Sequence, residues 1–165
     1  MPQPVSRILV INDERLVLRE LIKGLNSAAK SLDNPLGIVF SGVATAQEAL
    51  QAIEHDGDIQ AVVVDDTLYT LNSDRNGSRP LQSGSRTLQM SALNLVQNIT
   101  RFRPELNVYI LIAQEQEDEV VDALFTEAVD GYFYREERDY RGMYRILNAQ
   151  IQEKARTPFY DQLKN

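Results

Sequence analysis

The sequence has no cysteine and a single histidine among its 165 residues. Without cysteine the chain can form no disulfide, no thiolate nucleophile and no sulfur-ligated metal site. His55 has no second histidine with which to hold zinc, and the segment His55-Asp56-Gly57-Asp58 is typical of a turn after a helix. These absences narrow the range of enzyme classes that the chain could belong to. They are also compatible with a cytoplasmic protein.

Long apolar runs and an excess of positive charge are missing as well. No run of about eighteen apolar residues occurs, so we expect no membrane-spanning helix. Residues 1–7 lack the apolar centre of a signal peptide. The formal net charge is −7, whereas proteins that bind nucleic acid need clustered Lys and Arg. We therefore expect a cytoplasmic protein whose partners include neither membranes nor nucleic acid.

The chain does contain short apolar runs that alternate with helical patterns. The apolar runs predict five strands, at 7–11, 38–43, 61–65, 108–113 and 131–134. The patterns with a period of three to four residues predict five helices, over 14–29, from the capping box Thr45-Ala46-Gln47-Glu48 to Asp56, from Leu88 to Phe102 before Pro104, over 120–128, and through the inward-facing residues Tyr144, Ile146, Leu147 and Ile151.

Strands that alternate with helices predict an α/β fold of three layers, with a parallel sheet covered on both faces. One doubly wound arrangement of this size is flavodoxin-like, a five-stranded parallel sheet with strand order 2-1-3-4-5. We expect one domain over residues 1–155, because a chain of this length can bury a core without staples. It is interrupted by a long loop at 67–86 that is rich in Ser, Asn and Gly.

The predicted third strand, Ala61-Val62-Val63-Val64, runs directly into Asp65 and Asp66. Ligands of open α/β sheets bind at the carboxyl ends of the strands, where the strand order reverses. In the 2-1-3-4-5 order that point lies between strands 1 and 3, so Asp65 is expected beside Asn12 and Asp13. Carboxylates there can bind Mg²⁺, accept a phosphoryl group or only cap the strand end.

Three segments resemble the signature strands of response-regulator receiver domains: Ile8-Leu9-Val10-Ile11-Asn12-Asp13-Glu14, Ala61-Val62-Val63-Val64-Asp65 and Gly131-Tyr132-Phe133-Tyr134-Arg135. Residues 94–106 resemble the third helix of those domains and the turn after it. The resemblance covers roughly residues 6–150 apart from the 67–86 loop. It implies that Asp65 takes the place of the phosphoacceptor and that Asn12-Asp13 takes the place of an acidic pair.

The implied site departs from the receiver pattern at several positions. Asn12 replaces one carboxylate of the acidic pair, and Ala113 stands where a Thr or Ser should end strand 4. Arg135 replaces a Lys; it keeps the charge but not the compact ammonium geometry. We therefore expect a degenerate site in which Asp65 and Asp66 cap the strand end or bind loop backbone, with weak Mg²⁺ affinity through Asp13 and Asp65.

The C-terminal segment Thr157-Pro158-Phe159-Tyr160-Asp161-Gln162-Leu163-Lys164-Asn165 offers a second resemblance, to the junction in bacterial ornithine/lysine/arginine decarboxylases. In that family a receiver-like N-terminal wing domain leads through a linker helix to a catalytic core that uses pyridoxal phosphate (PLP). Thr157 and Pro158 suit the N-cap and first position of such a helix, and Phe159 and Leu163 lie one turn apart. The resemblance implies that 156–165 begins a linker to a catalytic domain that this chain lacks.

Together the two resemblances favour a non-catalytic domain that serves assembly or regulation of a PLP-dependent basic amino-acid decarboxylase. Its partners would be its own catalytic domain and the other subunits of a homo-oligomer. The chain itself would be no enzyme and would hold no cofactor, since PLP belongs to the absent domain. The alternative is a receiver of two-component signalling that is phosphorylated on Asp65, with Mg²⁺ as its cofactor.

Overall fold

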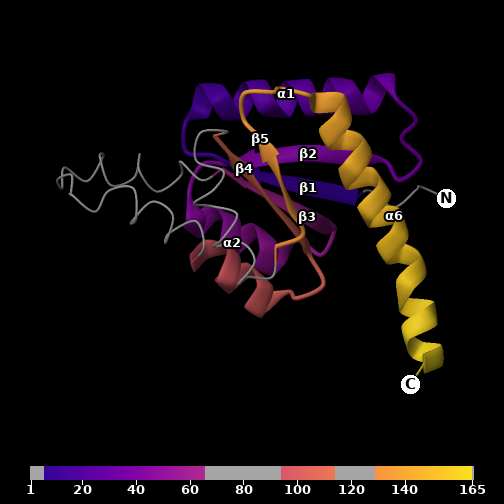
Figure 1. Cartoon of the computed structure of the whole chain (residues 1–165). Coiled ribbons are helices and arrows are strands. Elements are labelled where there is room, and N and C mark those ends of the chain that lie inside the picture. The colour runs from indigo at the N-terminus through magenta and orange to yellow at the C-terminus, as the bar shows by residue number, and fades with distance from the viewer. Residues whose placement is uncertain (1–5, 66–93, 114–128, 165) are drawn as a thin grey trace.

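The fold is that of a computed structural model, which describes residues 6–65, 94–113 and 129–164, with side chains as far as Glu153. Its strands are β1 (Ser6–Ile11), β2 (Ile38–Val43), β3 (Ile59–Asp65), β4 (Asn107–Ile112) and β5 (Gly131–Tyr134). They form one sheet in the order β2-β1-β3-β4-β5, and every neighbouring pair is parallel (Figure 1). The predicted sheet and strand order are confirmed.

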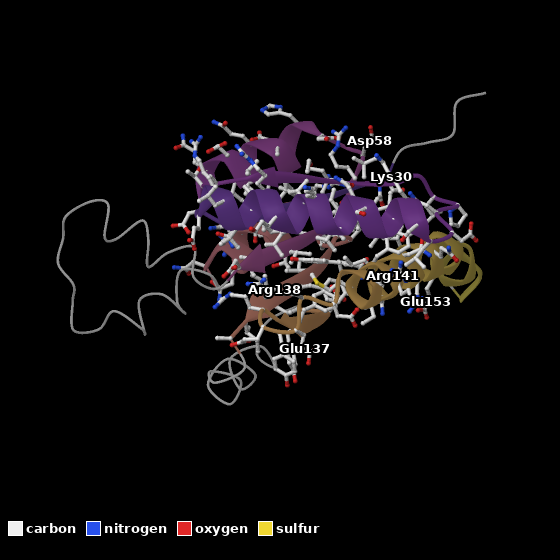
Figure 2. The ribbon with its side chains drawn as sticks, turned by 90° about the horizontal axis from the view of Figure 1, so that it is seen from above. Lys30, Asp58, Glu137, Arg138, Arg141 and Glu153 are labelled. Atoms are coloured by element: carbon white, nitrogen blue, oxygen red, sulfur yellow. The ribbon has the colours of Figure 1, made fainter. Side chains whose placement is uncertain are left out.

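Helices cover both faces of the sheet and make three layers (Figure 1). Helices α1 (Arg15–Ser31) and α6 (Tyr140–Lys164) lie side by side on one face (Figure 2), and α2 (Ala46–His55) and a helix over 94–102 lie on the other. Each face has its own apolar core. From Ala61 on, every β3 residue is buried, as is every β4 residue, because both strands are covered on both sides.

Local sequence explains where α2 begins and ends. The hydroxyl of Thr45 accepts a hydrogen bond from the backbone N–H of Glu48 at 3.0 Å, which caps the start of α2 as predicted. The Glu48 carboxylate accepts from the same hydroxyl at 3.1 Å. The helix ends at His55, and the predicted turn after it is confirmed.

Two residues predicted to face inward are exposed. Phe102, 58% exposed, ends its helix, and the residues described around it do not cover its ring. Ile146, 47% exposed, is about a quarter turn away from the buried stripe of Tyr144, Leu147 and Ile151 on α6. The predicted end of the helix before Pro104 is confirmed.

Helix α6 corrects the predicted boundary at Thr157. It begins at Tyr140, where the Asp139 side chain accepts a hydrogen bond from the backbone N–H of Gly142 at 3.0 Å, and it runs through Pro158 to Lys164. Thr157 is therefore not the N-cap of a new helix. The division of the chain at 155/156 into a domain and a linker stays a prediction. The 67–86 loop, the 120–128 helix and the side chains of Phe159 and Leu163 lie outside the described residues.

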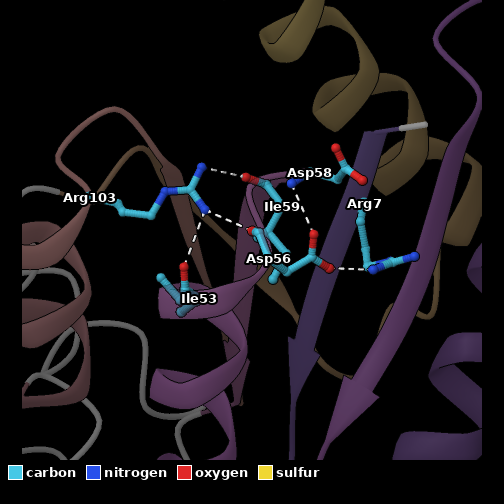
Figure 3. Close-up of polar contacts among 6 residues, drawn as sticks. All are labelled: Arg7, Ile53, Asp56, Asp58, Ile59 and Arg103. Carbon is cyan, nitrogen blue, oxygen red and sulfur yellow. Dashed lines mark hydrogen bonds and ion pairs between the residues drawn. The ribbon is translucent and has the colours of Figure 1, made fainter. Parts of the chain in front are cut away.

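Arg103 connects three elements at the amino end of the sheet (Figure 3). Its guanidinium donates to the carbonyl oxygens of Asp56 and Ile59, each at 3.0 Å, and approaches that of Ile53 at 3.4 Å. The Asp56 carboxylate in turn pairs with Arg7 of β1. One side chain thus satisfies carbonyl groups at the end of α2 and the start of β3. Of the helices in the described ranges, none is long and apolar enough to cross a membrane.

Candidate functional site

The carboxyl ends of four strands bring the predicted site residues to one edge of the sheet. Asn12 and Asp13 follow β1, and Asp65 is the last residue of the adjacent β3. Ala113 follows β4 and Arg135 follows β5, in strands that pair directly. The backbone N–H of Arg135 donates to the carbonyl of Ile112 at 2.7 Å, which extends the pairing of the two strands to this residue.

Both oxygens of the Asp65 carboxylate are engaged by neighbouring side chains. The amide nitrogen of Asn12 donates to Oδ2 at 2.6 Å, and the guanidinium of Arg135 donates to Oδ1 at 2.7 Å. The Asp65 side chain is only 1% exposed, whereas that of Arg135 is 29% exposed. Because the guanidinium carries a fixed positive charge, it compensates the buried carboxylate and makes the contact a charge-assisted one. We call this arrangement of Asn12, Asp65 and Arg135 the Asp65 clamp.

Asn12 is held in its place by its other contacts. Its side-chain oxygen accepts from the backbone N–H of Glu14 at 2.8 Å, and its own backbone N–H donates to the Val43 carbonyl at 3.2 Å. These contacts fix which end of the Asn12 amide is oxygen and which is nitrogen, because the oxygen faces the N–H of Glu14 and the nitrogen faces the carboxylate of Asp65. The Asn12 oxygen is therefore engaged in the turn that precedes α1, and the amide nitrogen is the atom that faces Asp65.

The donor set of this edge fits Mg²⁺ poorly. Magnesium takes oxygen ligands in octahedral geometry, usually with one or two carboxylates. Asn12 presents an N–H to the site, and both Asp65 oxygens already accept hydrogen bonds. Asp13, which follows Asn12 at the end of β1, is fully buried. No group of three or more His, Cys, Asp or Glu side chains able to hold a metal occurs within the described ranges. Weak Mg²⁺ affinity through Asp13 and Asp65 stays a prediction.

The remaining predicted positions add no donor. Ala113 is buried directly after β4 and carries no hydroxyl. Asp66 lies outside the described residues. Sequence reasoning placed Asp65, Asn12 and Arg135 near one another but did not predict the direct ion pair between Arg135 and Asp65. The signal available was the exchange of Lys for Arg, whose planar fork suits a carboxylate.

Comparisons with known proteins add information about the fold. No protein-family model matches the chain, and no curated protein matches its sequence. Solved structures do match. A CheY-like response regulator receiver domain protein from Methanospirillum hungatei superposes with a TM-score of 0.62 at 17% identity, over 93% of this chain and 98% of that one.

Two further structures agree with this match. A response regulator receiver domain protein from Clostridium thermocellum has a TM-score of 0.56 at 19% identity, over 90% of this chain and 93% of that one. A LuxR family DNA-binding response regulator from Silicibacter pomeroyi has a TM-score of 0.59 at 15% identity, over 90% of this chain and 93% of that one. Identities this low carry information about fold alone. Nothing in the comparisons supports the predicted link to the decarboxylases, which stays a prediction. The chain has the CheY-like receiver fold.

Proposed function

We propose that this chain is a receiver-type regulatory domain that works through protein contacts and without phosphorylation of Asp65. The observation that carries the proposal is the Asp65 clamp, in which Asn12 and Arg135 engage both oxygens of the carboxylate. In this proposal the domain is no enzyme, and the Asp65 clamp stays closed.

The clamp and the residue at position 113 oppose phosphoryl transfer for three physical reasons. A carboxylate that attacks phosphorus must bring an oxygen close to it and in line with the leaving group. In this chain each Asp65 oxygen already accepts a hydrogen bond, of 2.6 Å from Asn12 and 2.7 Å from Arg135, which fixes the carboxylate in its present orientation and lowers its reactivity as a nucleophile. The negative charge that a divalent cation would offset is already met by Arg135, and Ala113 offers no hydroxyl to the transferred group.

The proposal is tested by treating the purified chain with acetyl phosphate and Mg²⁺ and measuring its intact mass. We expect no phosphoryl adduct on the wild type, as on Asp65→Asn. The matched positive control is the triple variant Asn12→Asp/Ala113→Thr/Arg135→Lys, which restores the receiver set of side chains and is expected to gain an adduct. An adduct on the wild type that Asp65→Asn removes would overturn the proposal.

The second candidate is a receiver that accepts phosphate on Asp65. The observation in its favour is position: Asp65 ends β3, the neighbouring strand β1 is followed by the buried Asp13, and a cation contacts Asp65. The same mass measurement decides between the two candidates.

It stays a prediction that the chain is part of a decarboxylase. It also stays a prediction that PLP is bound by a separate domain and that the partners are the other subunits of an oligomer. Reading the native gene for the residues that follow Asn165 tests it, because a PLP-lysine core there would establish it. A cytoplasmic location stays a prediction too, and fractionation of the native cells tests it.

A further inference from the structure

A surface groove runs along the seam between α1 and the edge strand β2, on the side of α1 away from α6. Its first part has a volume of about 490 Å³ and a floor formed by Leu18, Ile22, Gly42, Val43 and Ala44. A second hollow, of about 400 Å³ and lined by Asn26, Lys30 and Val39 among others, lies farther along the same seam, and we treat it as the second part of the groove. Figure 2 shows Lys30 on the side of α1 opposite α6, which carries Arg141 and Glu153.

One wall of the first part of the groove is a row of cations. Arg15, Arg19 and Lys23 follow one another at intervals of four residues along α1, so they share one face of the helix, and all three are exposed. None of them forms an ion pair with a carboxylate in the ranges that the structure describes. Glu48 is the only acidic residue among those lining this part. A basic row of this kind contrasts with the chain's net charge of −7.

The strand edge beside the groove is closed to strand addition by two asparagine side chains. The Asn26 amide accepts from the backbone N–H of Phe40 at 2.9 Å and donates to its carbonyl at 3.1 Å. The Asn34 amide does the same to Ile38, at 2.9 and 3.2 Å. Backbone groups of alternate residues point to opposite sides of a strand, so these are outward-facing groups of β2. An extended partner would find them occupied, and only Gly42 would remain.

A helical partner has no such difficulty, because its backbone hydrogen bonds are internal. The cations repeat once per turn, and carboxylates spaced by one turn on a second helix would match them. Between Arg15 and Lys30 the groove follows about 22 Å of α1, the length of a partner helix of about fifteen residues. The apolar floor of Leu18, Ile22 and Val43 would receive an apolar side chain of that helix.

We propose that the α1–β2 groove binds an acidic amphipathic helix of a partner protein. Glu or Asp side chains one turn apart pair with Arg15, Arg19 and Lys23, and an apolar side chain between them packs on the groove floor. Charge complementarity, the one-turn spacing and the capped strand edge carry the proposal. The groove is separate from the Asp65 clamp, so the proposal stands whether or not Asp65 accepts phosphate.

The probe is a fluorescent helical peptide of about sixteen residues with Glu at one-turn intervals beside a Leu stripe, together with a scrambled peptide of equal composition. We expect saturable binding of the first peptide, weakened by added salt, and shifts of backbone amide signals at α1 and β2. The triple variant Arg15→Glu/Arg19→Glu/Lys23→Glu should weaken binding about tenfold or more, since three attractive pairs become repulsive.

The matched control is Arg138→Glu/Arg141→Glu/Arg145→Glu, which changes the net charge equally at three exposed arginines of the β5–α6 turn and α6. It should bind like the wild type, and circular dichroism of both variants confirms folding. Absence of binding, equal binding of the scrambled peptide, or equal loss in the control variant would overturn the proposal. Tight binding of duplex DNA through Arg15, Arg19 and Lys23 would also overturn the proposal, because the groove would then bind nucleic acid. A wild-type dimer that the Arg15→Glu/Arg19→Glu/Lys23→Glu variant dissociates would overturn it too, because a second copy of the chain would then fill the groove.

Discussion

Removing the cation of the Asp65 clamp is expected to leave a buried carboxylate without its charge partner. Breaking a buried ion pair from one side costs about 3–5 kcal/mol. Here Asn12 still donates to Asp65 and the Arg135 side chain is 29% exposed, so water can reach part of the vacated space. We therefore expect Arg135→Ala to lower the free energy of unfolding by about 2–3 kcal/mol. For a domain of this size the melting temperature should fall by about 4–12 °C.

A double-mutant cycle isolates the interaction between the two side chains. In an Asp65→Asn background the buried charge is gone, so Arg135→Ala should cost about 1 kcal/mol or less, which leaves a coupling of about 1–2 kcal/mol. Urea unfolding followed by circular dichroism measures all four chains, at low and high salt. The coupling should persist at high salt, because a buried pair is screened little. The matched control Arg145→Ala, at an exposed position of α6, should change stability by about 0.5 kcal/mol or less. Equal cost of Arg135→Ala in both backgrounds would refute the reasoning.

Three further changes test the fold around the site. Arg103→Ala should cost about 2–4 kcal/mol in urea unfolding, because two carbonyls 3.0 Å from the guanidinium lose a charged donor. Arg101→Ala, at an exposed position in the last turn of the preceding helix, should be near neutral, and equal effects would contradict the role of Arg103. Gly24→Ala should lower the melting temperature, since the added Cβ would lie 2.5 Å from the Tyr140 ring. In a Tyr140→Ala background the same change should stabilise by about 1 kcal/mol through helix propensity, and a loss there would argue against the clash. Burial, and secondarily the charge of Asp130, raises the pKa of Tyr109 from 10.0 to about 12, so its contribution to stability is present below pH 10 and is lost as the pH rises to about 12. Tyr109→Phe should flatten that alkaline loss in pH-dependent urea unfolding; an unchanged pH profile would contradict this.

The sheet could be predicted from the sequence because its central strands are covered on both faces. A strand buried on both sides needs a continuous apolar run, as in Ala61 to Val64, and such a run is visible without a structure. The strand ends were less well defined: β3 begins at Ile59 and β4 ends at Ile112. In β3 the backbone pairing begins before the apolar run, and in β4 it stops before the run ends.

The site could be predicted only as far as topology determines it. Adjacent parallel strands bring Asn12 and Asp65 together whatever their side chains do. Which side chain contacts which oxygen depends on reach and rotamer, and the pairing of Arg135 with Asp65 spans 70 residues of sequence. Arg103 carried no signal at all, because a guanidinium that binds carbonyls 44–50 residues away follows no local pattern.

The central claim is that Asp65 is already occupied by side chains of its own chain. The most direct test is to titrate the wild type with beryllofluoride and Mg²⁺, which together mimic a bound phosphoryl group, and to follow the backbone amide signals by NMR. We expect no saturable shift of the signals at the strand ends, and we expect the titration to have equally little effect on the signals of Asp65→Asn. Saturable shifts around Asn12, Asp65 and Arg135 that disappear in Asp65→Asn would contradict the account.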